Sequence, residues 1–364
     1  MSAVLRAGRS IGTAGALVGL AAAGAAVGLA AERYAIGRSL RERDPYADEP
    51  FGSLRGDPLV VTAVDGVELH AEVDEPPPGV EPDLTVVFSH GYALNLDVWH
   101  FQRRDLRGIA RLAFWDQRSH GRSGRAPEGS VAFDRLAGDL AAVLDAVAPT
   151  GRVVLVGHSM GGMTVMDLLA RHPELLGERV VGVTLVASSA GGLSEVTLGV
   201  PGPAGRLAGR LAPGVVTALA RQPDLVERSR RAGSDLGFVL TKRYSFADDA
   251  PPSLVEFTAQ LNAGTPIGVV ADFLPVFATH EQRERLGVLA AVDTLVIGAG
   301  RDLLTPMSHS REISRRLPSA RYVEVPDAGH MVLLERHEVV TAHLRAQVDR
   351  VRTAVRGAAE PTRR

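Results

Sequence analysis

Residues 152–171, RVVLVGHSMGGMTVMDLLAR, carry the most specific structural pattern of this chain. Val153–Val156 is an unbroken apolar run, which is typical of a parallel strand buried on both faces of a sheet. It leads directly into a Gly-x-Ser-x-Gly motif around Ser159, and Gly162 onward has the pattern of a helix that ends before Pro173. A sharp turn from strand to helix presents the serine hydroxyl at its tip, and only glycines fit its crowded flanks. The stretch therefore predicts a nucleophilic serine after a buried strand.

A serine hydroxyl is a weak nucleophile unless a base takes its proton and an acid orients that base. Two later strand-like runs each end in a candidate partner: Asp302 follows Thr294–Ile297, and His330 follows the next run along the chain. Because the carboxyl ends of parallel strands meet at one edge of a sheet, we expect both side chains near Ser159. Asp327 is a competing acid, but it lies only three residues before the histidine on the same loop. The order Ser159, Asp302, His330 is therefore the predicted catalytic triad.

Hydrolysis through an acyl-serine also requires two N–H donors for the negatively charged oxygen of the tetrahedral intermediate. One candidate is the backbone N–H of Met160, directly after the serine. The loop Ser89-His90-Gly91-Tyr92-Ala93 follows another buried run, and its glycine allows the backbone to approach a substrate. The N–H groups of Tyr92 and Met160 are the predicted oxyanion hole.

The remaining pattern indicates an α/β fold. Two alternating stretches flank Asp65-Gly66 and predict an antiparallel hairpin near residues 59–73. The later runs are continuously apolar, and helical patterns such as Phe133–Val147 and a last helix near 333–352 lie among them. Strands that alternate with helices predict an open, doubly wound parallel sheet. The further predicted strands are Leu84–Phe88, Ala110–Trp115, Val180–Ala187 and Tyr322–Val325.

A long insertion interrupts this alternation. Between residues 191 and 289 no strand-like run occurs, and prolines punctuate helical patterns, one of which would open on a capping box of Ser253 and Glu256. A helical insertion between two core strands predicts a cap over the site. The predicted organisation is an N-terminal segment and linker (1–45), a first core part (46–190), the cap (191–289), a second core part (290–355) and a tail (356–364).

The cap sequence is rich in apolar side chains, among which Phe257, Phe273 and Phe277 are candidate substrate contacts. Packing within the cap is the alternative for each of them. Together they favour a substrate with an apolar acyl or aromatic group over a sugar or a peptide.

Composition excludes several other classes of protein. The 40 basic and 42 acidic residues nearly balance, so no nucleic-acid partner is expected. The chain has no cysteine, no histidine pair with metal-ligand spacing and no glycine-rich phosphate loop, so no metal or nucleotide cofactor is expected. Lys242 is the only lysine, which indicates a GC-rich, bacterial genome.

The N-terminus suggests a membrane association. Residues 11–31 carry no charge over 21 positions, enough to cross a bilayer at about 1.5 Å per residue. The segment is predicted as a single anchor in the bacterial cell membrane; a signal peptide or a helix packed on the protein are the alternatives. Arginines directly after it favour a catalytic domain on the cytoplasmic side. Residues 38–58 are charged and contain three prolines, which is typical of a linker.

These motifs resemble, in order, those of the α/β-hydrolase superfamily in its lid-bearing, single-domain branch. The match covers about residues 58–350 and rests on the His90-Gly91 loop, the stretch Asp116–Ser123, the serine motif, the loop ending at Asp302 and the pair Gly329-His330. The resemblance implies a mostly parallel, eight-stranded sheet with helices on both faces and an inserted helical cap. It also implies that His90, His120, His158, Asp116 and Arg118 are structural rather than catalytic.

The same resemblance implies a carboxylesterase- or lipase-like enzyme acting on a small-molecule ester or lipid. Epoxide hydrolases and dehalogenases are disfavoured, because they carry an aspartate where Ser159 stands. Two alternatives use the same triad, namely a carbon–carbon bond hydrolase and a cofactor-free haloperoxidase or perhydrolase. A third belongs to another class: a ligand-binding receptor whose triad is idle.

Overall fold

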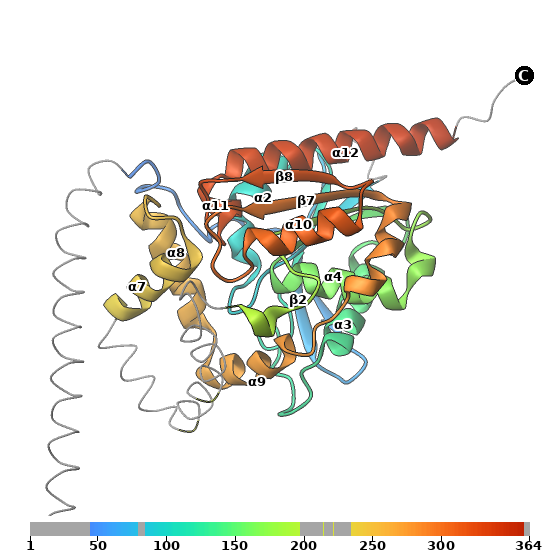
Figure 1. The fold of residues 1–364 in the computed structure, drawn as a ribbon. Helices are drawn as coiled ribbons and strands as arrows, with labels where there is room; N and C mark the ends of the chain where they lie inside the picture. Colours follow the sequence, from blue (N-terminus) through green and yellow to red (C-terminus); the bar gives the residue numbers. More distant parts are fainter. Residues whose placement is uncertain (1–43, 79–83, 197–213, 215–220, 222–233, 360–364) are drawn as a thin grey trace, which may run out of the picture.

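The computed structural model describes residues 44–78, 84–196, 214, 221 and 234–359 (Figure 1). An eight-stranded sheet lies at its centre, in the order β1-β2-β4-β3-β5-β6-β7-β8. The strands are β1 Asp57–Thr62, β2 Glu68–Asp74, β3 Leu84–Ser89, β4 Arg111–Trp115, β5 Arg152–His158, β6 Val180–Val186, β7 Asp293–Ala299 and β8 Arg321–Val325. Every strand predicted from an apolar run is present, and the eight-stranded fold class is confirmed.

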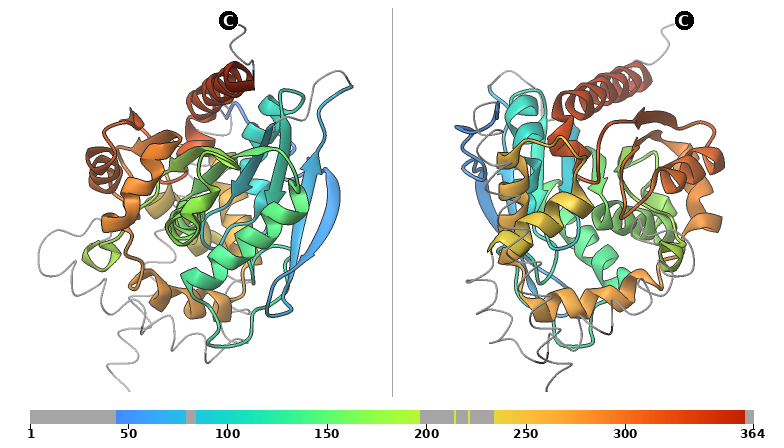
Figure 2. Two further views of the ribbon diagram at one scale, coloured as in Figure 1. Left: turned by 90° about the vertical axis from the view of Figure 1, so that its right-hand side faces the viewer. Right: turned by 60° about the vertical axis from the view of Figure 1, so that its left-hand side comes forward.

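The direction of the strands follows the sequence pattern. β1 and β2 pair antiparallel around the turn at Asp65-Gly66, and β2 also runs antiparallel to β4. All other neighbours are parallel. The hairpin forms the outer edge of the sheet, drawn in blue in the left view of Figure 2. β3 lies between β4 and β5, so the strand order reverses there, and the crevice at the carboxyl ends of β3 and β5 is the expected ligand site of such a sheet.

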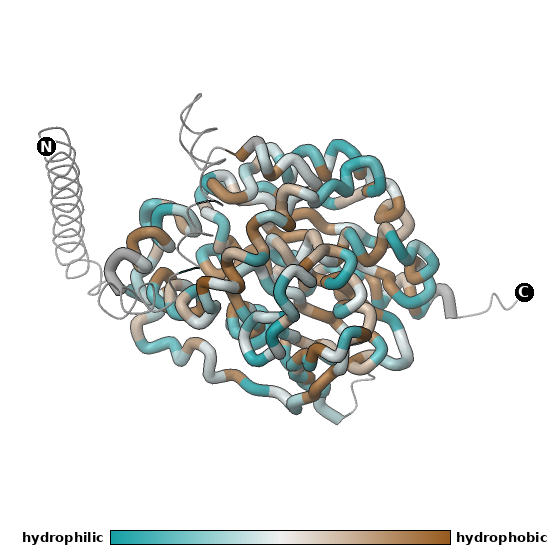
Figure 3. Tube along the Cα trace, turned by 90° about the horizontal axis from the view of Figure 1, so that it is seen from below, coloured by the Kyte–Doolittle hydropathy of each residue, from teal (hydrophilic) through white to brown (hydrophobic). Residues whose placement is uncertain are grey.

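Helices cover both faces of the sheet. One face packs against α3 (Phe133–Val147), α4 (Met160–Arg171) and α10 (Met307–Arg316), and the other against α2 (His100–Leu106), α11 (Val332–Glu335) and α12 (His337–Ala359) (Figure 1). Short 3-10 helices are η1 Leu96–Trp99, η2 Pro173–Leu175, η3 Leu193–Glu195 and η4 Arg283–Ala291. The central strands are therefore buried on both faces, which is why their sequences are continuously apolar. Figure 3 shows many of the hydrophilic segments at the periphery of the chain trace.

Besides η3 and η4, the α-helices whose bounds are described between β6 and β7 are α7 Ser234–Ser245, α8 Pro252–Gly264 and α9 Ile267–Phe277. α7 and α8 sit side by side beyond the ends of the strands in Figure 1, as expected of a helical cap. The limits of 191 and 289 stay a prediction, because most residues from 197 to 233 lie outside the described part.

The predicted capping box is wrong. α8 begins at Pro252, one residue before Ser253, and its N-cap residue is Pro251, which makes no side-chain capping hydrogen bond. Ser253 instead donates from its backbone N and its hydroxyl to the carboxylate of Asp44, over 2.8 Å and 2.9 Å. A carboxylate far away in sequence thus binds the backbone N–H of Ser253, which Glu256 would have bound in a capping box.

The C-terminal helix differs from its prediction near 333–352. Arg336 leaves the helical conformation (φ −132°, ψ 46°) and divides the segment into α11 and α12. The second helix then continues to Ala359, beyond the predicted end of the core. The break places Glu335 at the end of a short helix, next to the loop of His330.

The described part of the predicted linker, residues 44–58, contacts both the core and the cap. Phe51 stacks on Phe257 of the cap helix α8 with ring centres 4.7 Å apart, and Tyr46 contacts Phe101 of α2 at 5.3 Å. Residues 11–31, predicted as a membrane anchor, lie outside the described residues. Within the described ranges, we find no helix that combines the length and the apolar character needed to cross a membrane.

Candidate active site

Ser159 occupies the strained turn that its motif predicts. It joins β5 directly to α4 with φ 51° and ψ −117°, a backbone conformation that residues other than glycine rarely adopt. A Cβ atom at Gly157 would overlap the backbone of Gly162, and one at Gly161 would overlap Ser89. The flanking glycines are therefore required by close backbone contacts, and they allow the serine to stand at the tip of the turn.

His330 and Asp302 are brought together by the loops after β8 and β7. The Nδ1 atom of His330 lies 2.7 Å from Oδ2 of Asp302, whose side chain is fully buried. An ionised carboxylate only accepts hydrogen bonds, so Nδ1 carries the proton and Nε2 is left with its lone pair. This is the tautomer that a general base needs.

Asp302 is itself held by the loop that follows it. Its Oδ1 atom accepts from the N–H groups of Leu304 and Thr305, both over 2.8 Å, and the Thr305 hydroxyl lies 2.8 Å from Oδ2. Thr305 was not found from the sequence. A threonine three residues after an aspartate is a known local hydrogen-bonding pattern, and it could have served as the signal.

The rival acid, Asp327, is placed elsewhere. Its side chain is 59% exposed and forms an ion pair with Arg336 over 2.7 Å. Arg336 holds the pKa of this carboxyl below its usual value. Of the two candidate acids, Asp302 is the one that hydrogen-bonds His330.

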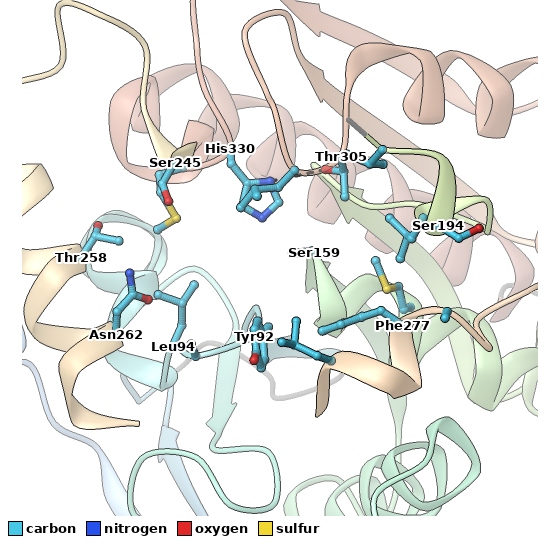
Figure 4. A pocket seen from close by; sticks show the side chains of 18 residues that line it. Tyr92, Leu94, Ser159, Ser194, Ser245, Thr258, Asn262, Phe277, Thr305 and His330 are labelled. Atoms are coloured by element: carbon cyan, nitrogen blue, oxygen red, sulfur yellow. Dashed lines mark hydrogen bonds between the residues drawn. The ribbon is translucent and has the colours of Figure 1, made fainter. Parts of the chain in front are cut away.

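Ser159 and His330 line one cavity of about 590 Å³ between the core and the cap (Figure 4). Among the described residues, no hydrogen bond joins the serine hydroxyl to the histidine; such bonds often shorten only once substrate is bound. Most of the wall is apolar, and the polar side chains of Ser245, Thr258 and Asn262 gather at one end of the cavity (Figure 4). The apolar lining includes Leu94, Met163, Leu193, Val196, Leu274, Phe277, Ala278 and Leu304.

The two predicted oxyanion donors flank this cavity. Tyr92 lies on the cavity wall and Met160 opens α4 next to the serine. Neither backbone N–H is used by another described residue. The Tyr92 hydroxyl donates to the carbonyl of Val270 in α9, which ties this loop to the cap. Both donors are thus available, and their role stays a prediction.

Of the three predicted substrate contacts, only Phe277 lies on the cavity wall. Phe257 stacks on Phe51 instead, and Phe273 is fully buried against Tyr92 and His120. The correction has a simple cause: apolar spacing marks a residue as buried, but it does not separate packing inside the cap from a place on the cavity wall.

Three histidines near the site have structural positions. His90 donates from Nδ1 to the carbonyl of Gly91 and accepts from the N–H of Gln117 at Nε2. Burial lowers its pKa to about 3, so it is neutral. His158 is also buried, which holds its pKa well below the ordinary value, and its Nε2 donates to the carbonyl of His330 over 3.0 Å. His120 donates to the carbonyl of Arg118.

Asp116 and Arg118 brace the loop after β4. Asp116 accepts from the N–H groups of Leu96 and Arg122, and burial raises its pKa to about 6. Arg118 is fully buried and pairs with Asp139 of α3 and Asp65 of the hairpin turn. Both residues hold the fold around the site. In the described part of the chain, no group of three or more histidine and acidic residues could hold a metal ion.

A doubly wound sheet with a serine on a strand-to-helix turn and a buried Asp–His pair is the arrangement of the α/β-hydrolase fold. A family model for the alpha/beta hydrolase fold matches residues 85–337, and the chain belongs to this family. Its relatives include a lipase and, among solved structures, an enol-lactonase.

Two curated relatives and one solved structure illustrate the similarity. The chain is 28% identical over 278 residues (74% of this chain, 64% of the relative) to the dihydrolipoyllysine-residue acetyltransferase component of the acetoin cleaving system of Pseudomonas putida. It is 28% identical over 228 residues (61% of this chain, 66% of the relative) to the sn-1-specific diacylglycerol lipase ABHD11 of Mus musculus. The match therefore spans slightly less than two thirds of each relative. The structure of the enol-lactonase from Burkholderia xenovorans LB400 superposes with a TM-score of 0.64 and 25% identity. The superposition covers 80% of this chain and 100% of the lactonase chain.

Proposed function

We propose that the protein cleaves carboxylic esters of apolar acyl or aromatic groups through an acyl-serine intermediate. One observation carries the proposal: Ser159 and the Asp302-paired His330 line the same largely apolar cavity. An apolar wall with few polar groups suits a hydrophobic acyl chain better than a sugar or a peptide. The lipase and lactonase among its relatives act on ester bonds, in agreement with this proposal.

In the proposed mechanism, the hydroxyl oxygen of Ser159 attacks the ester carbonyl while Nε2 of His330 takes its proton. Asp302 keeps the imidazole in the required tautomer and stabilises its positive charge. The N–H groups of Tyr92 and Met160 bind the oxyanion. His330 then gives its proton to the leaving alcohol, and afterwards activates a water molecule that hydrolyses the acyl-serine.

Labelling with a fluorophosphonate, followed by turnover of p-nitrophenyl esters, tests the proposal. We expect stoichiometric labelling of the wild type, none of Ser159→Ala, and turnover that rises from acetate to longer acyl chains. Labelling without turnover would favour a receptor with an idle triad. Labelling with turnover only of carbon–carbon bonds, or only in the presence of peroxide, would favour the two other chemistries of the same triad.

Phe277 gives the most direct test of the acyl preference. We expect Phe277→Ala to reduce kcat/KM for an octanoate ester by about tenfold more than for acetate, because one lost apolar contact discriminates by about 1–3 kcal/mol. The measurement is the ratio of kcat/KM for the two esters. Phe257→Leu is the matched control, since Phe257 packs on Phe51 and not on the cavity wall. Equal changes of the ratio in both variants would contradict a contact between Phe277 and the acyl chain.

We also propose that residues 11–31 anchor the protein in the bacterial membrane, with the catalytic domain on the cytoplasmic side. The full chain is then expected to fractionate with membranes and to resist extraction by high salt, because apolar contacts are not screened. Deletion of residues 1–43 should release an active, soluble enzyme. The deletion stops before Asp44, whose carboxylate binds Ser253 of the cap. Recovery of the intact chain in the soluble fraction would contradict the anchor.

A further inference from the structure

The cap touches the loop of the candidate catalytic histidine through backbone contacts. Met331 donates from its N–H to the carbonyl of Ser245, the last residue of α7, over 2.8 Å. A Cβ atom at Gly329 would lie 2.6 Å from the carbonyl carbon of Phe246 and 2.8 Å from the N of Ala247. Glycine is therefore needed at position 329 for the two backbones to lie this close. The two contacts come from the residues directly before and after His330.

One buried carboxylate joins the same two segments. Glu335, at the end of α11, accepts from the N–H of Gly329 over 2.9 Å. It also accepts from the N–H of Ala247, which lies 3.2 Å and 3.1 Å from its two oxygens. Its neighbour Arg336 is engaged with Asp327 instead. Glu335 is only 6% exposed. In the described ranges its carboxylate accepts hydrogen bonds from backbone N–H groups and forms no salt bridge.

A buried carboxylate is costly unless its hydrogen bonds repay the loss of water, so this position calls for an explanation. We propose that Glu335 is a positioning residue that ties the α7–α8 connection of the cap to the loop of His330, so that the histidine is held in place only while the cap is seated. This inference rests on the proposed function, in which His330 is the base.

The geometry shows how the tie would act on His330. The histidine stands one residue after Gly329, whose N–H binds Glu335, and one residue before Met331, whose N–H binds the cap. A shift of the cap connection would pull on both neighbours and turn the ring away from Ser159. Loss of such positioning affects the chemical step and hence kcat. Much of the apolar wall, including Met163 of α4 and Leu274 and Phe277 of α9, lies outside this contact, so KM should change little.

The charge of Glu335 gives the proposal a distinctive pH dependence. Burial raises the pKa of Glu335 to about 7. The charged groups that act on it are Arg336, which favours the ionised form, and Asp249 of the α7–α8 connection, which opposes it. Asp327 holds Arg336 from the loop before His330. Below pH 7 the carboxyl carries a proton; on Oε2 this proton faces the N–H of Ala247, which keeps only its 3.2 Å contact to Oε1, so the link to the cap is weakened.

Glu335→Gln mimics this protonated form and is the main test. Above pH 8 we expect kcat to fall by about tenfold to a hundredfold with little change in KM, because a small misplacement of a catalytic group has effects of this size. Below pH 6 the wild type is protonated too, and the difference should shrink to about twofold. Hydrogen exchange at the amides of Ala247 and Gly329 should be faster in the variant at pH 8.

Stability should follow the opposite trend. The folded-state pKa of Glu335 is raised, so the wild type loses stability as pH rises from the unfolded value of 4.5 through about 7. The glutamine does not titrate, so the Tm of Glu335→Gln relative to wild type should improve as its relative kcat worsens. A residue with a merely structural role would move stability and activity in the same direction.

Two variants serve as controls. Asp327→Asn changes an exposed carboxylate on the same loop and should leave kcat within about twofold of wild type, the usual result for a surface change. Gly329→Ala pushes the two backbones apart without altering the carboxylate, and should lower kcat even if Glu335→Gln fails to fold. Full kcat at pH 8 in a folded Glu335→Gln or Gly329→Ala protein would overturn the inference. His330→Ala separates the two proposals: if it keeps activity, the proposed function itself fails.

Discussion

Replacing Ser159 with alanine is expected to reduce kcat for ester hydrolysis by about 10⁵-fold or more, since no acyl-enzyme can form. The variant should fold normally. Alanine inherits the same backbone strain at φ 51°, and the flanking glycines keep their close contacts. The measurement is kcat on a p-nitrophenyl ester together with Tm, which should stay within a few degrees of wild type.

His330 is the base that activates Ser159 in the proposed mechanism. His330→Ala should cost about as much as Ser159→Ala, because the serine is not activated without its base. The double variant should lose little more than the worse single variant, since the residues act as one unit. An additive loss in the double variant would show that the two side chains act separately, and would contradict the proposed mechanism.

Asp302→Asn is expected to reduce kcat by about 10⁴-fold while leaving the fold intact. The reason lies in the hydrogen bonds of Asp302. Two backbone N–H groups, from Leu304 and Thr305, donate to Oδ1, so the amide oxygen of an asparagine must take that place. Its NH₂ group then faces Nδ1 of His330 and forces the proton to Nε2. A histidine protonated at Nε2 is unable to accept the proton of Ser159.

Asp327→Asn is the matched control for the choice of acid. Asp327 is exposed and paired with Arg336, so its loss should change kcat by no more than about twofold. The comparison uses one ester at one pH above neutrality. If Asp327→Asn were the more damaging of the two substitutions, Asp302 would not be the triad acid.

Much of the fold could be predicted because its signals are local. A strand buried on both faces must be apolar along its whole length, and the runs Leu84–Phe88 and Val153–Val156 lie inside β3 and β5. Phe133–Val147 was predicted with its exact limits as α3, because its apolar side chains recur at helical spacing. The serine turn was also local, since its glycines and its flanking strand and helix are adjacent in sequence.

For groups far apart in sequence, the predicted strand topology indicates only which side chains lie at the same edge of the sheet. Parallel strands put Asp302, Asp327 and His330 at the same edge of the sheet, which made all three candidates. The choice between the two acids depends on where each loop turns after its strand. One carboxylate is buried within 2.7 Å of Nδ1, and the other points to solvent and binds an arginine.

Local sequence patterns are enough to predict the α/β class, the strands, the serine turn and the order of the candidate triad, because periodicity and turn chemistry act over a few residues. Packing between distant segments decided that Phe277 reaches the cavity while Phe257 packs on Phe51, and that Asp44 rather than a local capping box binds Ser253. It also decided that Glu335 binds both the cap and the histidine loop. Hydrophobicity and polarity say that a side chain will be buried or hydrogen-bonded; only the packing of segments far apart in the chain selects its partner.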